Sequence, residues 1–401
     1  MKVAIIFERF GEYHHARLHA VAKLIDTVGI EIAQADDTYE WGHARSRGSY
    51  KFECLAKDMS VGRNAIADRL FDRLDKHSPD IVAVPGWFPS YAHAGIDWAY
   101  RNNARALIMS DSNLFDAPRR WVVERIKKAI VRHACGGFVA GRCAREYICK
   151  LGLPSDRVVL GYNCVDNAHF ARDEHTKIRG SGVFLSVGRF IPRKNFLGLL
   201  KAFRIYLDRL PAGRSPWRLV LVGDGGQRDE LIAEAQRLDL AELVEFPGFA
   251  QYIELPGIYH AANVFILPSL VEQWGLVVNE ALAAGLPILV SERCGSARDL
   301  VLNGFNGYEF DPSDHVELAR YMEALSGDPE LIQRMASVCP SISAIWDADR
   351  FANSVLAISH IMMAEPLPVL SLLDRSIFRA IRISSKAIEK LPFSYISRSR
   401  V

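Results

Sequence analysis

The sequence lacks any arrangement of cysteines that is typical of cross-links or of a metal site. Its seven cysteines contain no CxxC pair and are odd in number. This argues against a disulfide framework and against a zinc site built on paired cysteines. A reducing compartment is the simpler interpretation, so we expect a cytoplasmic protein whose cysteines fill space in its core.

Long apolar runs are also missing. No stretch approaches the roughly 18 uncharged apolar residues that a membrane-spanning helix needs. The run at the N-terminus, MKVAIIF, is stopped by Glu8 and Arg9. It is too short for a signal peptide and is expected to form the first β-strand. Any contact with a membrane is therefore expected to use one face of the folded protein.

Neither sign of charge is in clear excess. Lys and Arg total 49 and Asp and Glu total 47, which gives a net charge of +2. A dedicated nucleic-acid binder carries a strong basic excess, so no nucleic-acid partner is expected. However, the charges are distributed unevenly along the sequence. Residues 366–401 hold seven basic and two acidic residues, or +5, so the rest of the chain carries −3.

What the chain does have is 401 residues, 49% of them hydrophobic, which is enough for two domains. Short runs rich in Val, Ile and Leu alternate with helical patterns, which predicts parallel sheets covered on both faces. The expected strands are 2–7, 80–85, 106–110, 137–140, 158–161, 183–187, 218–222, 244–247, 264–267, 288–290 and 307–310.

These patterns predict two doubly wound α/β domains of similar size. We place them at 1–172 and 173–340, with the polar stretch 171–181 as the linker. Residues 341–401 are expected to be helices that return to the first domain, with helical patterns over 346–362 and 374–391. Ligands of such sheets bind at the carboxyl ends of the strands, so we expect a site in a cleft between two facing domains.

The segment 268–285, PSLVEQWGLVVNEALAAG, is the most informative. It predicts a loop carrying Glu272 and a helix that begins near Gly275 and carries Glu280. A helix N-terminus suits a phosphate, and a carboxylate can accept hydrogen bonds from two neighbouring sugar hydroxyls. Taken alone, these residues fit a capped helix with a solvated glutamate equally well.

Three further segments each follow an expected strand. In 186–195, SVGRFIPRKN, Gly188 leads a turn that carries Arg189 and Lys194. Two cations at one strand end can neutralise a diphosphate. The segments 219–226 (LVLVGDGG) and 244–249 (VEFPGF) end in glycine turns. Neither fits the dinucleotide fingerprint, which disfavours a nicotinamide dehydrogenase.

Together, these segments resemble the retaining glycosyltransferases of family 4, which have the GT-B architecture. The resemblance lies in the order and spacing of VGR…K, VGDG, FPGF and Glu272-x7-Glu280 with EALAAGLPILVS, and it covers residues 183–310. The first half of the chain resembles the family more loosely, through 11–18 (GEYHHARL) and 161–170 (GYNCVDNAHF).

The resemblance implies a nucleotide-sugar donor, a glycan or lipid-linked acceptor and no metal or other cofactor. Arg189 and Lys194 would bind the diphosphate, Glu280 the ribose and Glu272 the transferred sugar, with Phe249 beside the base. The backbone around Trp274, Gly275 and Leu276 would bind sugar hydroxyls and phosphate, and Gly188 would belong to the donor loop. The acceptor side would include Gly11, Tyr13, His14, His15 and Arg17. The alternative for His14 and His15 is that neither binds the acceptor, with one side chain packed in the protein and the other in solvent.

The sequence departs from the family in two places. Where members often have a histidine in the first domain, the chain has Ser110 and Asp111. Three roles are open for Asp111: it replaces the family's histidine in catalysis, it binds the acceptor, or it caps a turn. Where members often have a Gly-Gly-x-x-Glu run, the chain has GSARD at 295–299, so a donor contact there is in doubt. The single DxD triplet, 347–349, is interpreted as a solvated helix face.

The inferred function is therefore transfer of a hexose from a UDP- or GDP-sugar, with retention, in the assembly of a cell-surface polysaccharide or glycolipid. A nucleotide-sugar epimerase and a non-catalytic, sugar-nucleotide-binding partner subunit are the alternatives. Two segments, 118–133 and 374–391, combine basic residues with an apolar stripe, which is typical of helices that lie on anionic membranes. A core-facing helix is the alternative for both. The expected location is the cytoplasm, including the inner face of the cell membrane.

Overall fold

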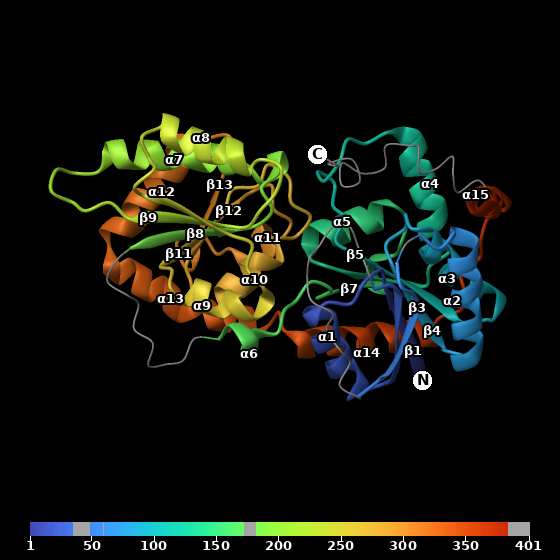
Figure 1. The fold of residues 1–401 in the computed structure, drawn as a ribbon. Coiled ribbons are helices and arrows are strands. Elements are labelled where there is room, and N and C mark those ends of the chain that lie inside the picture. The colour runs from blue at the N-terminus through green and yellow to red at the C-terminus, as the bar shows by residue number, and fades with distance from the viewer. Residues whose placement is uncertain (35–48, 59, 172–181, 384–401) are drawn as a thin grey trace. The chain divides into compact units, whose positions relative to one another are not determined.

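The structure is a computed structural model that describes residues 1–34, 49–58, 60–171 and 182–383. It divides the chain into two compact units (Figure 1). The first begins with Met1–Cys164 and takes up the chain again at Ala348, and the second is Val165–Asp347. Each unit holds one parallel sheet covered by helices, which confirms the prediction of two doubly wound α/β domains. The boundaries differ from those placed by sequence. The first unit ends at Cys164, where the sequence placed residue 172, and the chain returns to it at Ala348, where the sequence placed residue 341.

In the described part of the first unit, seven parallel strands form a sheet in the order β3-β2-β1-β4-β5-β6-β7. The strands are β1 (Lys2–Phe7), β2 (Asp26–Ala33), β3 (Lys51–Ala56), β4 (Ile81–Pro85), β5 (Arg105–Ser110), β6 (Gly136–Val139) and β7 (Val158–Leu160). The helices before the crossing are α1 (Glu12–Ala22), α2 (Arg63–His77), α3 (Ser90–Arg101), α4 (Trp121–Val131) and α5 (Arg142–Lys150), with the 3-10 turn η1 (Ser155–Arg157). The sequence analysis missed β2 and β3.

Alternating side chains bury both faces of this sheet. Val3, Ile5 and Phe7 belong to a core that includes residues of α1 and of a C-terminal helix. On the opposite face, Gly95 of α3 lies so close to β4 that a Cβ there would meet Val84 at 2.8 Å. Because strand side chains point alternately to the two faces, both sets must be apolar, as the sequence pattern indicated.

The chain returns to the first unit through α14 (Ala348–Ala364), and α15 (Leu372–Ile383) follows. Phe351, Val355, Ile358 and Met362 of α14 are buried in the core of the first sheet. Helix α14 packs against α1, β6 and β7, and α15 packs against α4 and α3. The C-terminal helices are thus part of the first unit. The end of the predicted segment 374–391 and most of the predicted linker lie outside the described residues.

The sheet of the second unit has the order β10-β9-β8-β11-β12-β13, again with parallel pairing. Its strands are β8 (Val183–Val187), β9 (Arg218–Val222), β10 (Val244–Gly248), β11 (Val264–Leu267), β12 (Ile288–Ser291) and β13 (Gly307–Phe310). The helices are α6 (Asn167–Phe170), α7 (Phe196–Arg209), α8 (Arg228–Arg237), α9 (Leu255–His260), α10 (Leu276–Ala283), α11 (Ala297–Leu300), α12 (His315–Gly327) and α13 (Pro329–Ala344), with the 3-10 turns η2 (Pro192–Lys194) and η3 (Tyr252–Glu254).

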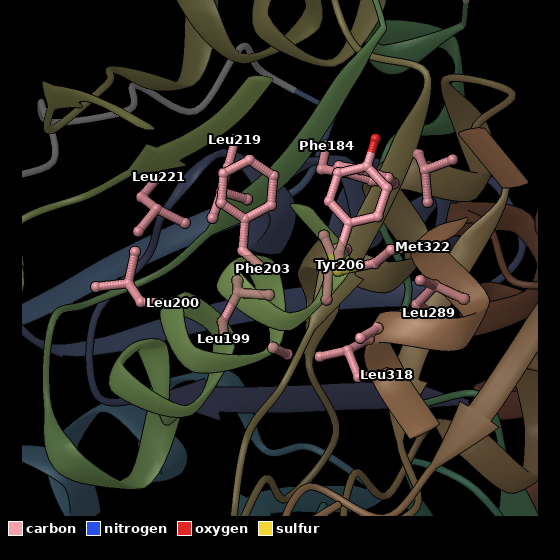
Figure 2. Close-up of a cluster of buried hydrophobic side chains, with 14 of the residues drawn as sticks. Phe184, Leu199, Leu200, Phe203, Tyr206, Leu219, Leu221, Leu289, Leu318 and Met322 are labelled. Carbon is pink, nitrogen blue, oxygen red and sulfur yellow. The ribbon is translucent and has the colours of Figure 1, made fainter. Parts of the chain in front are cut away.

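The core of the second unit lies between this sheet and helices α7 and α12, which pack against each other. Figure 2 shows Phe184 and Leu219 of the strands meeting Phe203 and Tyr206 of α7. Leu318 and Met322 of α12 complete the cluster. Burying an aliphatic or aromatic side chain of this size contributes about 1.5–3 kcal/mol. This core holds β8 and β11 rigidly side by side, and the loops that follow them carry the predicted donor residues.

Candidate active site

All the predicted donor residues except Phe249 follow β8 or β11, the two central strands of the second sheet. The strand order runs outward from this pair in both directions, because β9 and β10 lie beyond β8 while β12 and β13 lie beyond β11. In open parallel sheets, a crevice forms at such a point, outside the carboxyl ends of the strands. The topology thus brings the Gly188–Lys194 loop and the Glu272 loop to one edge of one sheet.

Lys194 and Glu272 form an ion pair across these two loops. The loops are also joined through backbone atoms, because the Leu270 amide donates to the Arg193 carbonyl at 2.8 Å. The Asn195 side-chain amide donates to the Pro268 carbonyl at 3.1 Å. Burial by itself raises the pKa of Glu272, but the Lys194 ammonium outweighs it and lowers that pKa below its ordinary value. Glu272 is therefore a carboxylate at neutral pH.

Two glycines after β9 hold the loop that carries Arg189. Gly223 has a φ of +143°, and a Cβ there would lie 1.9 Å from the carbonyl oxygen of Gly188. Gly225 has a φ of +150°, and its Cβ would lie 2.7 Å from the carbonyl oxygen of Phe190. Only glycine tolerates both the backbone conformation and this approach. The VGDG segment therefore supports the backbone of the predicted phosphate loop, and Arg189 lies half-buried between these two contacts.

Helix α10 begins at Leu276, and Gly275, which caps it, has a φ of +92° in the left-handed region. The side chain of Trp274 lies inside the protein, where its indole N–H donates to Asn279 at 2.8 Å and its ring contacts Trp346 with centroids 5.0 Å apart. Trp274 can therefore offer a ligand only its backbone. The first amides of an α-helix generally lack partners within the helix, and such an end suits an anion. The contact expected for the backbone of Gly275 and Leu276 stays a prediction.

Glu280 is buried in α10, where Tyr259 of α9 donates its hydroxyl to a carboxylate oxygen at 2.7 Å. Tyr259 was not predicted, because nothing in the sequence pattern indicated that α9 brings it to Glu280. A carboxylate held by a phenol keeps a fixed orientation, and carboxylate oxygens are suitable acceptors for hydroxyl groups of a ligand.

The loop after β12 lies against the Glu272 loop. The Gly295 amide donates to the Glu272 carbonyl at 3.0 Å, and the Glu272 amide donates to the Arg293 carbonyl at 3.2 Å. Burial raises the pKa of the Cys294 thiol well above its usual value, and the Glu272 carboxylate adds to this. Cys294 is therefore a neutral thiol without nucleophilic character. The GSARD segment, in doubt from its sequence, starts beside a predicted sugar-binding residue.

Phe249 follows β10, the strand at the edge of the second sheet, and its ring is 43% exposed. Two strand spacings separate β10 from β8, which corresponds to about 10 Å. Phe249 is thus apart from the Lys194–Glu272 pair, in keeping with a contact to the far end of a nucleotide.

The predicted acceptor residues differ in what they can offer a ligand. The Arg17 guanidinium is buried and donates to the Cys164 carbonyl through Nε at 3.0 Å and Nη2 at 2.5 Å. His15 is buried and lies 2.5 Å from the Tyr50 hydroxyl, and Tyr13 is buried as well. These environments favour structural roles for all three.

Gly11 and His14 lie at the start of α1, directly after β1. The Gly11 amide donates to His14 Nδ1 at 3.0 Å. Burial, with the nearby charge of Arg17, lowers the pKa of His14 well below its ordinary value. His14 is therefore neutral, with its proton on Nε2, and can donate that proton to an oxygen of a ligand.

Asp111 is half-exposed in the loop after β5. Burial raises the pKa of Tyr162, and the Asp111 carboxylate raises it further, which places the two groups within electrostatic reach. The rest of the loop is ordered by its own side chains. The Ser112 amide donates to Ser110 Oγ at 3.2 Å, and the Phe115 amide donates to Asn113 Oδ1 at 3.1 Å.

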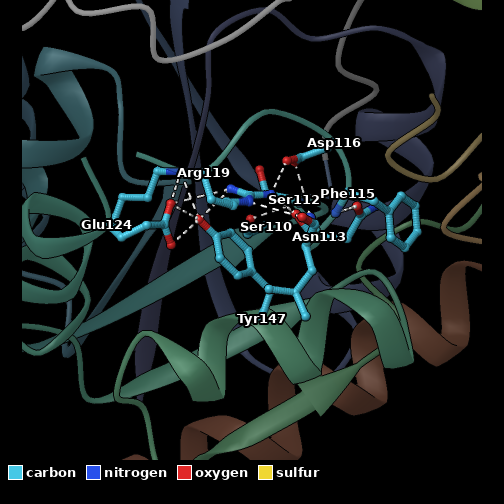
Figure 3. Close-up of polar contacts among 10 residues, drawn as sticks. Ser110, Ser112, Asn113, Phe115, Asp116, Arg119, Glu124 and Tyr147 are labelled. Atoms are coloured by element: carbon cyan, nitrogen blue, oxygen red, sulfur yellow. Dashed lines mark hydrogen bonds and ion pairs between the residues drawn. The ribbon is translucent and has the colours of Figure 1, made fainter. Parts of the chain in front are cut away.

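Figure 3 shows how this loop is anchored to α4 and α5. Arg119 binds Asp116 and donates to the Tyr147 hydroxyl at 2.6 Å. Tyr147 in turn donates to Glu124 at 2.9 Å, and Lys127 donates to Glu124 at 3.0 Å. Burial opposes ionisation of Glu124, but its bonds from Lys127 and Tyr147 lower its pKa. This network was not predicted, because its members are spread over more than 30 positions of the sequence.

No group of three or more His, Cys, Asp or Glu side chains within residues 1–34, 49–58, 60–171 and 182–383 is arranged to hold a metal ion. Of the DxD triplet, Asp347 precedes α14 and Asp349 lies exposed in its first turn. Asp349 fits the interpretation of a solvated helix face, whereas Asp347 lies before the helix and is half-buried. None of the helices described for this chain is long and apolar enough to cross a bilayer.

Comparison with known proteins identifies the second unit. Residues 168–338 match the model of the family described as glycosyl transferases group 1. This part of the chain is similar to the group 1 glycosyl transferases. The matched region contains Arg189, Lys194, Glu272 and Glu280, so the resemblance that these residues suggested is confirmed at the level of the family.

Relatives extend the similarity beyond the second unit. Glycogen synthase of Mycobacterium tuberculosis is 28% identical over 328 residues, which cover 77% of this chain and 75% of the relative. D-inositol 3-phosphate glycosyltransferase of Streptomyces griseus is 33% identical over 228 residues, covering 55% of this chain and 42% of the relative. HepE of Anabaena, solved in complex with UDP, is 18% identical with a TM-score of 0.70 and covers 90% of this chain and 100% of that one. The last comparison shows the GT-B type of fold.

Proposed function

We propose that this chain is a retaining glycosyltransferase of family 4 that moves a hexose from a UDP- or GDP-sugar to a glycan or lipid-linked acceptor. The observation that carries the proposal is the Lys194–Glu272 pair at the central strands of a group 1 domain, beside the N-terminus of α10. A cation, a carboxylate and helix amides at one sheet edge match the chemistry of a sugar diphosphate.

The proposed reaction assigns a task to each of these groups. Departure of the nucleoside diphosphate builds negative charge, which Arg189, Lys194 and the helix N-terminus stabilise. Glu280, held by Tyr259, accepts the two ribose hydroxyls, and Glu272 accepts hydroxyls of the transferred sugar. Retention then follows from attack on the face that the phosphate leaves, assisted by that phosphate, so no carboxylate nucleophile is required. Loss of either cation is expected to cost about 10²–10³ in rate, by analogy with lost oxyanion donors.

The names of relatives support the class of acceptor. O-antigen chain mannosyltransferase B of Escherichia coli is 28% identical over 179 residues, covering 42% of this chain and 45% of the relative. A solved lipopolysaccharide outer core galactosyltransferase, WaaB, has a TM-score of 0.67. We therefore place the reaction in the assembly of a cell-surface polysaccharide or glycolipid, in the cytoplasm or at the inner face of the cell membrane, without a metal cofactor.

A thermal-shift screen with UDP-, GDP- and ADP-sugars tests the donor site. A ligand at a hundred times its dissociation constant stabilises the folded state by about 2.7 kcal/mol, so one nucleotide series should raise the melting temperature measurably. Lys194→Ala and Glu280→Gln should abolish most of that shift, while Lys201→Ala, at an exposed position of α7, should keep it. A shift that survives in both site variants would contradict the assignment, as would no shift with any nucleotide.

Product analysis separates the alternatives. A transferase releases the nucleoside diphosphate only as sugar appears on an acceptor. An epimerase changes the sugar of the donor without any acceptor, and a non-catalytic partner subunit binds the donor and leaves it unchanged. Either of these two outcomes would replace the proposed reaction while leaving the donor site in place.

A further inference from the structure

Helices α4 and α15 of the first unit pack together through the apolar side of α15. Phe378 and Ile381 are buried, and the Phe378 ring stacks on His133 with centroids 4.2 Å apart. Asp374 is buried too, where it receives the Ser371 hydroxyl at 2.7 Å and pairs with Arg132 at 3.4 Å. Phe378 and Ile381, which belong to the predicted segment 374–391, therefore dock α15 onto the protein, as the core-facing alternative for this segment expects.

Other apolar side chains on or near these two helices are exposed to solvent. Trp121 is 82% exposed at the start of α4, with Val122 beside it. Val369 is 97% exposed and Leu372 is 82% exposed, at the approach to α15 and in its first turn. Exposing large apolar side chains to water is unfavourable, and a soluble surface rarely gathers several of them. Both helices thus combine a buried apolar side with apolar residues that face solvent.

The charges around these residues have one sign. Arg120 and Arg125 are exposed on α4, and Arg375 and Arg379 are exposed on α15. The acidic residues of the same two helices, Glu124 and Asp374, are drawn inward into the contacts described above. Among the described residues of α4 and α15, every exposed charge is therefore positive. We refer to Arg120, Trp121, Val122, Arg125, Val369, Leu372, Leu373, Arg375 and Arg379, which lie on or directly before two helices that pack together, as the α4–α15 surface.

We propose that the α4–α15 surface docks this protein onto an anionic lipid bilayer. Exposed Trp and Leu suit the boundary between headgroups and acyl chains, and arginines suit the negative surface potential of anionic lipid. A nucleic acid would match the arginines and leave Leu372 and Val369 in water. The docking does not depend on the nucleotide site and adds a partner to the proposed function.

Docking through the α4–α15 surface would also affect where the acceptor binds. Trp121 is five residues beyond Asp116, whose loop follows β5 and is fixed to α4 by Arg119, Glu124 and Tyr147 (Figure 3). Asp111 lies in the same loop. A protein docked through Trp121 thus holds this loop close to the bilayer, where a lipid-linked acceptor would be presented. This consequence rests on the proposed function, whereas the docking itself does not.

Sedimentation with vesicles tests the proposal on the full-length protein. The wild type should sediment with phosphatidylcholine vesicles that contain phosphatidylglycerol and stay in solution with phosphatidylcholine alone, because the arginines require anionic lipid. The variant Trp121→Ser/Leu372→Ser and the variant Arg125→Glu/Arg375→Glu should each lower the bound fraction by about tenfold or more. The matched control, Phe305→Ser/Arg334→Glu, alters exposed residues of the second unit and should bind like the wild type.

Two results would overturn the proposal. One is equal sedimentation of the wild type and both surface variants. The other is a chain ending at Ile383 that no longer binds although it keeps the α4–α15 surface, since the remaining 18 residues would then carry the binding. Circular dichroism checks that each variant is folded. The nucleotide thermal shift, measured on the same variants, reports the donor site separately, so a failed docking and a failed donor assignment are distinguishable.

Discussion

Lys194 and Glu272 are 78 positions apart in the sequence and form an ion pair in the fold. Each has a second task in the proposed reaction, Lys194 at the diphosphate and Glu272 at the sugar. The two side chains neutralise each other, which keeps both charged groups in place at a site with little solvent. The pair also makes the stability of the second unit depend on pH.

We expect Glu272→Gln to destabilise the second unit most at neutral pH. The folded-state pKa of Glu272 is below the unfolded value, so its ionised form stabilises the fold above about pH 4.5 and this contribution is lost as pH falls through the folded pKa. Breaking a buried pair costs up to about 3–5 kcal/mol. Urea unfolding across this pH range should show the gap between wild type and variant closing toward acid. A gap that is independent of pH would contradict the ion-pair account.

At the scale of the element, the loop after β9 acts as a support for the loop after β8. Gly223 and Gly225 contribute no side chain, and the absence of a Cβ is what lets the Gly188–Phe190 backbone approach. The sequence showed two glycines after a strand, which is an ordinary turn pattern. Their role as a support became visible only when the two strands were seen as neighbours.

Gly223→Ala should therefore disturb the predicted phosphate loop. Its Cβ would lie 1.9 Å from a backbone oxygen, whereas a Cβ at Gly213, also with a positive φ of +84°, would meet nothing within 4 Å. Both substitutions strain the backbone, so the comparison isolates the contact. Gly223→Ala should cost about 1–3 kcal/mol more than Gly213→Ala, as overpacked sites do. It should also weaken donor binding in the thermal-shift assay, and equal effects of the two variants would argue against the support role.

At the scale of the whole molecule, the chain makes its first unit from two separate stretches. Helix α14 crosses back to cover the first sheet, and α15 then covers part of α4 and α3. The residues that follow the second unit are thus required for the core of the first one.

Ile358→Ala should expose this dependence. Ile358 is fully buried in the core of the first sheet, and truncation of such a side chain costs about 2–5 kcal/mol. Hydrogen exchange should accelerate in β1, β4, β5 and β6, while the amides of 183–310 keep their protection. A loss of protection in the second unit instead would mean that the two units do not unfold separately.

The sequence by itself determined the fold class, the family and most strands. Hydrophobic runs encode buried parallel strands, and the order of glycines, cations and glutamates over 183–310 is specific. It missed β2 and β3, since Gly and Glu interrupt DTVGIEIA, and Lys and Glu interrupt the short run KFECLA. It placed Lys194 and Glu272 in two different loops, and strand order alone decided that these loops are neighbours.

Only the tertiary structure decided the rest, because burial and partners depend on residues far apart in the sequence. Arg17 and His15 have the composition of ligand-binding residues, yet they are buried and bonded inside the first unit. Tyr259 has no motif, yet it holds Glu280. Phe378 has the pattern of a membrane-facing residue, yet it packs on His133, while Trp121 and Leu372 remain exposed. A sequence pattern indicates that a face is apolar, and packing decides what covers it.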